Sequence, residues 1–241
     1  MANRPEERER EEVEGAPAER PRFVHYLFFR VDPQWQRLSE EERARGRREF
    51  ARLVEQQASR VSTFSYSATG LKPSADLVLW RIADSLDALQ DAYADLRKTT
   101  LGTYLQTTYI LFGMTRPSIY TKRRTTQEQA IDLQDRLRYL IVYPFSKTTE
   151  WYLMSREARQ GMMNEHMRVG HEHPEVRQVL LYSTGLDDHE FVVAYETDDL
   201  YSYQSLLIAL RSTEARRYTL KDQPIFTAIH RPLAEALELV A

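Results

Sequence analysis

Two stretches of similar pattern, DLVLWRIADSL at residues 76–86 and EFVVAYETDDL at residues 190–200, decide the fold of this chain. In each, an apolar run stops at an acidic turn, which predicts a strand followed by a helix. The second stretch begins 114 residues after the first. The same offset holds without a gap for Leu96-Arg97 and Leu210-Arg211, and for Tyr104 and Tyr218. The sequence therefore favours two similar halves, with a chance match of amphipathic patterns as the alternative.

The two halves share one order of predicted elements. The apolar run FVHYLFF at residues 23–29 predicts a buried strand. A second predicted strand, YLIVY at residues 139–143, ends 114 residues after the end of this run. Each half then runs strand, helix, strand, strand, helix, strand, which is the order of a ferredoxin-like unit. The predicted fold class is α+β, a duplicated ferredoxin-like fold with two antiparallel sheets packed face to face and helices outside.

This repeat divides the chain into four parts. Residues 1–21, rich in Glu, Arg, Pro and Ala, predict a disordered acidic tail. Residues 22–125 form the N-terminal half, 126–137 a polar linker, and 138–241 the C-terminal half. Ser39-Glu40-Glu41-Glu42 is a capping-box pattern that opens a helix whose inner face carries Phe50, Leu53 and Val54. Lys122-Arg123-Arg124 reads as a solvated turn, or else as an anion contact.

The composition excludes several kinds of function. The chain has 241 residues, a net charge of −3 and no cysteine, so disulfides, thiolate metal sites and a cysteine nucleophile are excluded. Neither nucleic acid nor an anionic membrane is an expected partner of a chain with this charge. The N-terminus has no apolar run typical of a signal peptide, and no stretch approaches the roughly 18 apolar residues of a membrane helix. We expect a cytoplasmic protein without a membrane span.

Among the six histidines, His166 is the candidate metal ligand. It falls near the end of SREARQGMMNEHM at residues 155–167, a predicted helix that begins after Ser155. Met162 and Met163 lie four and three residues before it, so they are expected on its helix face. A histidine on an apolar helix face suits an axial haem ligand, because soft neighbours accept the macrocycle. A core histidine that donates to a carbonyl is the alternative.

Residues 143–166, YPFSKTTEWYLMSREARQGMMNEH, and residues 176–200, VRQVLLYSTGLDDHEFVVAYETDDL, closely resemble the chlorite dismutase superfamily. The resemblance implies a dimeric α+β barrel built from two ferredoxin-like halves. It also implies a homopentamer and a haem in the C-terminal half, with His166 as the axial ligand of the iron.

Three positions resemble the coproheme decarboxylase branch of that superfamily. Gln178 stands where chlorite dismutases carry a distal arginine. Tyr143 and Lys147 match a Y-P-x-x-K motif of the decarboxylases, and Arg211 with Glu214 matches part of their M-R-F-D-E motif. Two features depart from that branch. Met167 replaces the glycine that usually follows the axial histidine, and S-T-G-L-D-D at residues 183–188 is closer to chlorite dismutases.

The resemblance implies conversion of coproheme (iron coproporphyrin III) to haem b, in which hydrogen peroxide drives the loss of two carboxyl groups as carbon dioxide. Coproheme is then both substrate and redox centre, and the coproporphyrin ferrochelatase is a possible transient partner. A chlorite dismutase, and a haem-binding sensor or carrier without turnover, are the alternatives.

The implied roles fall on a small set of side chains. Tyr143 would carry a radical beside a propionate, and Lys147 would hold a carboxylate and manage protons. Gln178 would hydrogen-bond a distal ligand without supplying charge. Glu214 would orient His166, or else be an ordinary surface charge, and Trp151 and Tyr152 are read as packing. The candidate propionate contacts are Arg211, Arg138, Arg136 and Tyr120.

Overall fold

The computed structural model describes residues 20–121 and 127–240 of the chain. The predicted tail, apart from its last two residues, lies outside the described residues, as does the basic triplet at residues 122–124. None of the helices in the described ranges has the length and apolar character that a membrane crossing needs.

Within the described ranges, nine strands form one antiparallel sheet. They are β1 (Phe23–Val31), β2 (Ser62–Lys72), β3 (Ala75–Ala83), β4 (Leu105–Met114), β5 (Tyr139–Lys147), β6 (Arg177–Tyr182), β7 (Phe191–Thr197), β8 (Thr219–Lys221) and β9 (Phe226–His230). The strand order is β7-β6-β4-β1-β3-β2-β9-β5-β8, and β7 also pairs with β5. Eight strands therefore close into a barrel, and β8 extends from β5.

The expected α+β class and barrel are confirmed, whereas the expectation of two antiparallel sheets packed face to face is wrong, because the nine described strands belong to one sheet. The strands of the two halves are joined on both sides, where Met114 of β4 pairs with Tyr182 of β6 and Tyr66 of β2 pairs with His230 of β9. These two short junctions convert two sheets into one. A closed sheet leaves no free edge at these junctions, and unpaired edges are the sites at which sheets aggregate.

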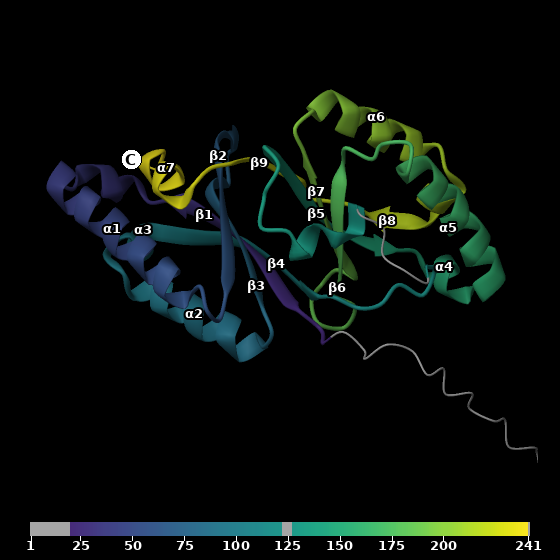
Figure 1. Cartoon of the computed structure of the whole chain (residues 1–241), viewed down its shortest axis with the longest axis horizontal. Helices are drawn as coiled ribbons and strands as arrows, with labels where there is room; N and C mark the ends of the chain where they lie inside the picture. Colours follow the sequence, from purple (N-terminus) through teal and green to yellow (C-terminus); the bar gives the residue numbers. More distant parts are fainter. Residues whose placement is uncertain (1–19, 122–126, 241) are drawn as a thin grey trace, which may run out of the picture.

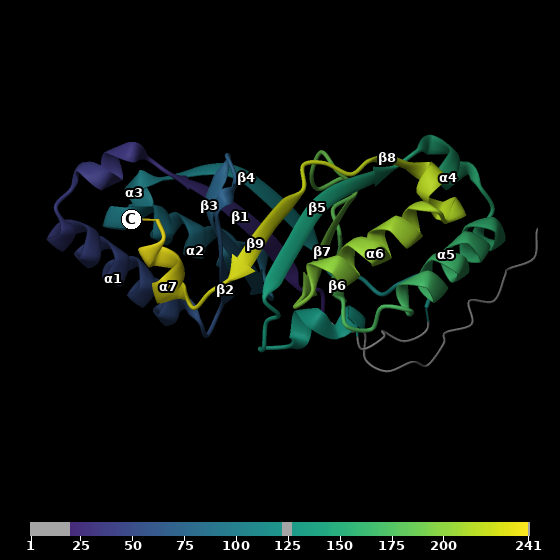
Figure 2. The ribbon, with the colours of Figure 1, turned by 90° about the horizontal axis from the view of Figure 1, so that it is seen from above.

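The helices of the described ranges are η1 (Pro33–Arg37), α1 (Glu40–Gln57), α2 (Leu86–Lys98), α3 (Thr100–Tyr104), η2 (Gln127–Asp132), α4 (Thr149–Leu153), α5 (Arg156–Gly170), α6 (Leu200–Arg211), η3 (Glu214–Tyr218) and α7 (Leu233–Glu238). Apart from η2, they lie at the two ends of the molecule, outside the barrel (Figure 1). Figure 2 shows α1, α2 and α7 at the end of the N-terminal strands, and α5 and α6 at the other end. The long elements of each half follow the predicted order, while the equivalence of the halves as ferredoxin-like repeats stays a prediction.

Local sequence signals explain where α1 begins. The Ser39 hydroxyl accepts a hydrogen bond from the Glu42 amide at 3.3 Å, and the Glu42 carboxylate accepts one from the Ser39 amide at 2.9 Å. The predicted capping box is therefore confirmed. Phe50 and Val54 on the inner face of this helix are buried, as expected.

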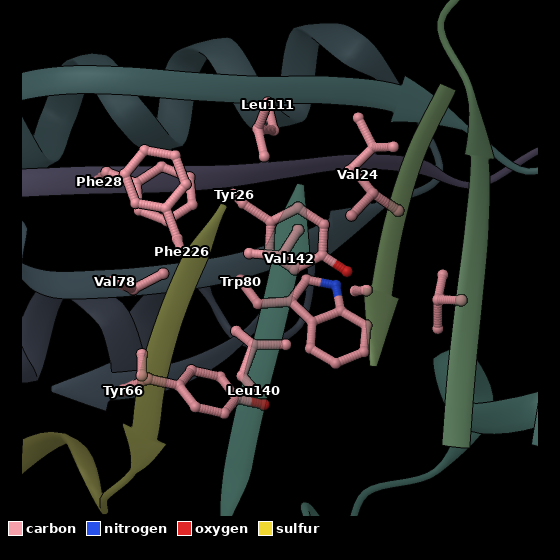
Figure 3. Packing of buried hydrophobic residues seen from close by; sticks show 14 of the residues in the cluster. Val24, Tyr26, Phe28, Tyr66, Val78, Trp80, Leu111, Leu140, Val142 and Phe226 are labelled. Carbon is pink, nitrogen blue, oxygen red and sulfur yellow. The ribbon is translucent and has the colours of Figure 1, made fainter. Parts of the chain in front are cut away.

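The barrel interior is a core shared by both halves. Because side chains alternate along a strand, Tyr26 and Phe28 of β1 point inward, as do Leu140 and Val142 of β5 (Figure 3). Phe28 stacks on Phe226 of β9 with ring centroids 3.8 Å apart. Burial of each such aromatic side chain contributes about 1.5–3 kcal/mol.

The segment between the halves also contributes to this core. Residues 127–132 form η2, and its Ala130 and Ile131 are buried in the barrel interior. The segment read as a polar linker therefore contains an apolar contact that anchors it to the sheet.

The outer faces of the two halves differ. In the N-terminal half, Leu77 and Leu79 of β3 pack against Trp35 of η1, Phe50 of α1 and Leu237 of α7. In the C-terminal half, α5 and α6 cover the outer face of β5, β6 and β7 incompletely, and a cavity remains beneath them.

Candidate functional site

The cavity beneath α5 and α6 has a volume of about 520 Å³. That volume falls within the roughly 300–1,000 Å³ typical of small-molecule sites. Tyr143, Phe145 and Lys147 of β5 line it at alternate positions, whereas Val142 belongs to the barrel interior. These three side chains therefore share one face of the strand, as alternation along a strand requires.

Helix α5 brings His166 into the cavity. The Ser155 hydroxyl accepts a hydrogen bond from the Ala158 amide at 3.2 Å, so the helix begins where the sequence predicted. Met163, His166 and Met167 line the cavity, at the three- and four-residue spacing of one helix face. Met162 is not among the lining residues.

The His166 imidazole is suited to hold a metal centre. Burial, with a smaller contribution from the positive charge of Lys147, lowers the pKa of His166 to about 4, so the ring is neutral at neutral pH. Its buried Nδ1 has no hydrogen-bond partner within the described residues. A neutral imidazole is the ligand of a haem proximal site, and Met163 and Met167 add apolar surface beside it.

One of the two alternatives for Glu214 was that it orients His166, and the structure does not support it. Its carboxylate binds Arg217 at 3.2 Å, and its backbone amide donates to the Glu165 carboxylate at 3.0 Å. Glu214 is thus an exposed partner of a neighbouring arginine, which is the other reading.

Strands β6 and β7 form the wall across from α5. Gln178 lines the cavity and lies directly opposite Tyr195 in the register of these two strands. Tyr195 was missed by the sequence reasoning. The signal was present, because alternation along FVVAYET places Phe191, Val193 and Tyr195 on one face.

Tyr143 lies in a group of three phenols. It is 8% exposed and belongs to the same cluster of buried side chains as Tyr195. The ring centroids of Tyr143 and Tyr195 are 6.2 Å apart, and those of Tyr195 and Tyr203 are 5.4 Å apart. Burial, followed by the neighbouring Tyr195 and Tyr203, raises the pKa of Tyr143 well above its ordinary value, so the phenol keeps its proton.

Lys147 lies at the end of β5 with its ammonium group inside the cavity wall. Its Nζ is 4.4 Å from the centroid of the Trp151 ring and 3.3 Å from the carbonyl oxygen of Ala215. Burial, with a further contribution from Arg216, lowers the pKa of Lys147 to about 8. Trp151 is buried and packs here as expected, and it also lines the cavity.

The charge of the cavity wall is strongly positive. Among the described lining residues, the basic ones are Arg116, Lys147, Arg159, Arg211 and Arg216. Asp222 is the one acidic residue of that set, and it binds Arg216 at 2.7 Å. The wall therefore favours a ligand that carries several negative charges.

Two of the predicted propionate contacts do not reach the cavity. Arg136 lies inside the barrel, where its Nη1 is 3.2 Å from the Glu196 carboxylate. Arg138 precedes β5, and its guanidinium lies 5.2 Å from the centroid of the Tyr139 ring. Neither lines the cavity. Both expectations are wrong. The physical reason is that both arginines precede β5, whose cavity-lining residues begin at Tyr143.

The structure supplies other candidates in their place. Arg211 and Tyr120, both expected, line the cavity. Arg116, Arg159 and Arg216 also line it but were not expected. A signal existed for Arg159, which lies seven residues before His166 on the same helix face.

Comparisons with known proteins define the class. A family model described as chlorite dismutase matches residues 41–231, so the chain belongs to the chlorite dismutase family. The family expected from the sequence is confirmed. A coproheme decarboxylase from Mycolicibacterium smegmatis is 32% identical to this chain over 207 residues, which cover 85% of this chain and 89% of that protein.

Solved structures agree with this assignment. An R-to-K mutant of the chlorite dismutase from Candidatus Nitrospira defluvii is 28% identical, with a TM-score of 0.85 over 92% of this chain and 97% of that one. The same enzyme in complex with imidazole gives a TM-score of 0.83 at 28% identity, over 91% and 95% of the two chains.

Proposed function

We propose that this protein binds coproheme (iron coproporphyrin III) in the cavity and converts it to haem b. The proposed reaction removes two propionate carboxyl groups with hydrogen peroxide as oxidant. The observation that carries the proposal is the joint lining of one cavity by His166, Tyr143 and five basic side chains. The similarity to a coproheme decarboxylase supports the choice of substrate.

The binding part of the proposal rests on charge and on the imidazole. Coproheme carries four propionates, and the wall offers five basic side chains against one carboxylate that is already paired. Charge-assisted hydrogen bonds from guanidinium groups such as Arg211 would hold these carboxylates. His166 would hold the iron from the side of α5, and Met163 and Met167 would contact the macrocycle.

The catalytic part rests on Tyr143. When bound, the iron porphyrin supplies oxidising equivalents from peroxide. Tyr143 would give up one electron and its phenolic proton to the peroxide-derived oxidant, and then take a hydrogen atom from the β-carbon of a propionate. The same oxidant would accept a second electron from the propionate as its bond to the carboxyl group breaks, which leaves a vinyl group and carbon dioxide. Lys147, with a pKa of about 8, can hold the carboxylate and exchange a proton near neutral pH. Gln178 would hydrogen-bond a distal ligand as a neutral group.

Gln178 and Tyr143 also separate this reaction from the alternatives. A neutral amide cannot supply the positive charge with which an arginine attracts and polarises an oxyanion such as chlorite. A carrier without turnover has no use for a buried phenol at the cavity wall. Both features favour decarboxylation.

We further propose that the chain is a cytoplasmic homopentamer of duplicated ferredoxin-like halves that receives coproheme from the coproporphyrin ferrochelatase. The absence of cysteine from the sequence fits a reducing compartment. Exposed apolar side chains, Leu153, Tyr201, Ile208 and Leu220, offer surface for contacts between subunits. Native mass spectrometry of the purified protein tests the pentamer directly.

One experiment tests the reaction. The protein is loaded with coproheme, peroxide is added in small portions, and the porphyrin mass is followed. Stepwise loss of two carboxyl groups supports the proposal, and an unchanged porphyrin mass contradicts it. Oxygen release from chlorite by the haem-loaded protein would favour the chlorite dismutase alternative.

A further inference from the structure

Arg81 is a buried arginine of the N-terminal half that the proposed function does not use. Its side chain is fully buried. It lies on β3, where the alternation that points Val78 and Trp80 into the barrel turns Arg81 to the outer face (Figure 3). Leu79 and Ala83, its neighbours on that face, belong to two separate apolar clusters. Arg81 therefore places a positive charge between two apolar parts of the core.

The hydrogen-bond partners of the Arg81 guanidinium are neutral. Its Nη2 donates to Oε1 of Gln57 at 2.6 Å, and its Nε donates to the hydroxyl of Thr63 at 3.3 Å. The amide of Gln57 in turn donates to the carbonyl oxygen of Ala92 at 3.1 Å. Nη1 of Arg81 is buried and has no hydrogen-bond partner within the described residues. The side chain is therefore held beneath α1 and α2 with one donor group free.

Two other buried arginines of this protein have a carboxylate partner. The Arg47 side chain is 7% exposed and binds Glu40 at 2.7 Å. The Arg136 side chain is 1% exposed and lies 3.2 Å from Glu196. Within the described parts of the chain no carboxylate forms such a pair with Arg81, and burial alone lowers its pKa, to about 10. Because a buried charge without a counter-charge is costly, this position favours an anion.

His25 supplies a second free donor beside Arg81. The two residues are paired in the antiparallel register of β1 and β3, so their side chains share one face, with Cβ atoms about 4.5–5.5 Å apart. His25 is 7% exposed, and its buried Nε2 has no hydrogen-bond partner among the residues that the structure describes. Burial, followed by the positive charge of Arg81, lowers the pKa of His25 to about 3. The ring is therefore neutral at neutral pH, and a neutral imidazole donates from one of its nitrogens.

We propose that a small monovalent anion, a halide, binds between Nη1 of Arg81 and Nε2 of His25. Nη1 supplies a charge-assisted hydrogen bond, and one negative charge balances one guanidinium. A buried water would satisfy the same donors but leave the charge uncompensated. Phosphate and sulfate carry more oxygen atoms than two donors can satisfy. This site lies in the N-terminal half and is independent of porphyrin binding.

The position of the anion is tested on the wild-type chain. Crystals are grown in sodium bromide, and anomalous differences are measured at the bromine absorption edge. A bromide peak within hydrogen-bonding distance of Nη1 of Arg81 and Nε2 of His25 is the expected result. Density without an anomalous signal, as for water, or no density at this place overturns the proposal.

Unfolding in urea tests whether the anion also binds in solution. Chloride is raised tenfold while gluconate, a bulky anion, keeps the ionic strength constant. Because unfolding releases the bound anion, we expect the unfolding equilibrium constant of the wild type to fall, by up to about tenfold. An unchanged constant would mean binding at crystal concentration only and overturns the proposal.

Matched variants assign the chloride effect to this site. Arg81→Met removes the charge at similar length and should abolish the effect. Arg47→Met removes a buried arginine whose charge is already paired, and it should keep the effect. An equal effect in Arg81→Met and wild type would place the anion elsewhere, for example at the basic wall of the cavity, and overturns the proposal.

A second variant covers the case in which Arg81→Met does not fold. His25→Leu keeps the guanidinium and removes one of the two free donors, so its chloride effect should be smaller than that of the wild type. An undiminished effect overturns the proposal. Neither coproheme nor peroxide enters these measurements, so the anion site and the proposed function succeed or fail separately.

Discussion

Phe29 and Tyr143 are separated by the 114-residue offset of the predicted repeat, yet Phe29 is packed in a closed core and Tyr143 lines an open cavity. A second pair with this offset differs in the same way. Leu79 is buried among the N-terminal helices, whereas Val193, 114 residues later, lines the cavity. The difference arises because Trp35 and α7 pack onto the N-terminal outer face. The same surface is filled in one half and available to a ligand in the other.

This asymmetry predicts one porphyrin site in each chain. Titration of the protein with coproporphyrin III, followed by fluorescence, is expected to saturate at one porphyrin per chain. The N-terminal face cannot accept a second because Trp35 is fully buried there. Saturation at two porphyrins per chain would show that the N-terminal half also binds.

Removal of the His166 imidazole should affect iron porphyrin and metal-free porphyrin differently. We expect His166→Ala to weaken coproheme binding by at least about tenfold, or about 1.4 kcal/mol, because the iron loses its ligand. Metal-free coproporphyrin III should bind nearly as well as to wild type, since its carboxylate contacts remain. Parallel titrations with the two porphyrins measure the difference, and equal losses for both would argue against an iron bond.

Arg211 and Arg138 form a matched pair, because the sequence suggested both as propionate contacts and the structure places only Arg211 at the cavity. Loss of a charge-assisted hydrogen bond costs about 1.5–3 kcal/mol. Arg211→Ala should therefore weaken porphyrin binding by about 10- to 100-fold. Arg138→Ala should leave it unchanged. A larger effect at Arg138 would restore the original expectation.

The lowered pKa of Lys147 predicts that porphyrin binding depends on pH. Burial and Arg216 lower the pKa of Lys147 to about 8 in the empty protein. A bound carboxylate favours the charged ammonium, so above about pH 8 the complex must take up a proton and affinity falls as pH rises. Lys147→Met removes the charge at similar length and should flatten this fall. Titrations of coproporphyrin III at about pH 7 and about pH 9 give the comparison, and an equal fall in the variant would assign it to another group.

Much of the site could be predicted because its signals are local. The capping residue Ser155 fixes the start of α5, and helical spacing then places His166 on the cavity side. Alternation along β5 places Tyr143 and Lys147 together. Gln178 and Arg211 were identified by resemblance rather than by spacing, and the structure brings both to the same cavity.

The resemblance implied a barrel, but the strand pairings that close it could not be predicted from local patterns in the sequence. Closure depends on pairings between β4 and β6 and between β2 and β9 that involve one and two residue pairs. Such short contacts leave no pattern in the sequence. The position of Arg136 could not be predicted from local sequence either. The carboxylate of Glu196, which holds it in the barrel, lies 60 residues further along the chain.

A hydrogen isotope effect on carboxyl loss tests the central claim most directly. Coproheme deuterated at the propionate β-carbons is bound to wild-type protein, peroxide is added, and the porphyrin mass is followed with time beside unlabelled substrate. If Tyr143 takes hydrogen from that carbon, deuterium slows the first carboxyl loss, and Tyr143→Phe abolishes the loss for both substrates. Equal rates for the two substrates, or carboxyl loss that continues in Tyr143→Phe, would contradict the account.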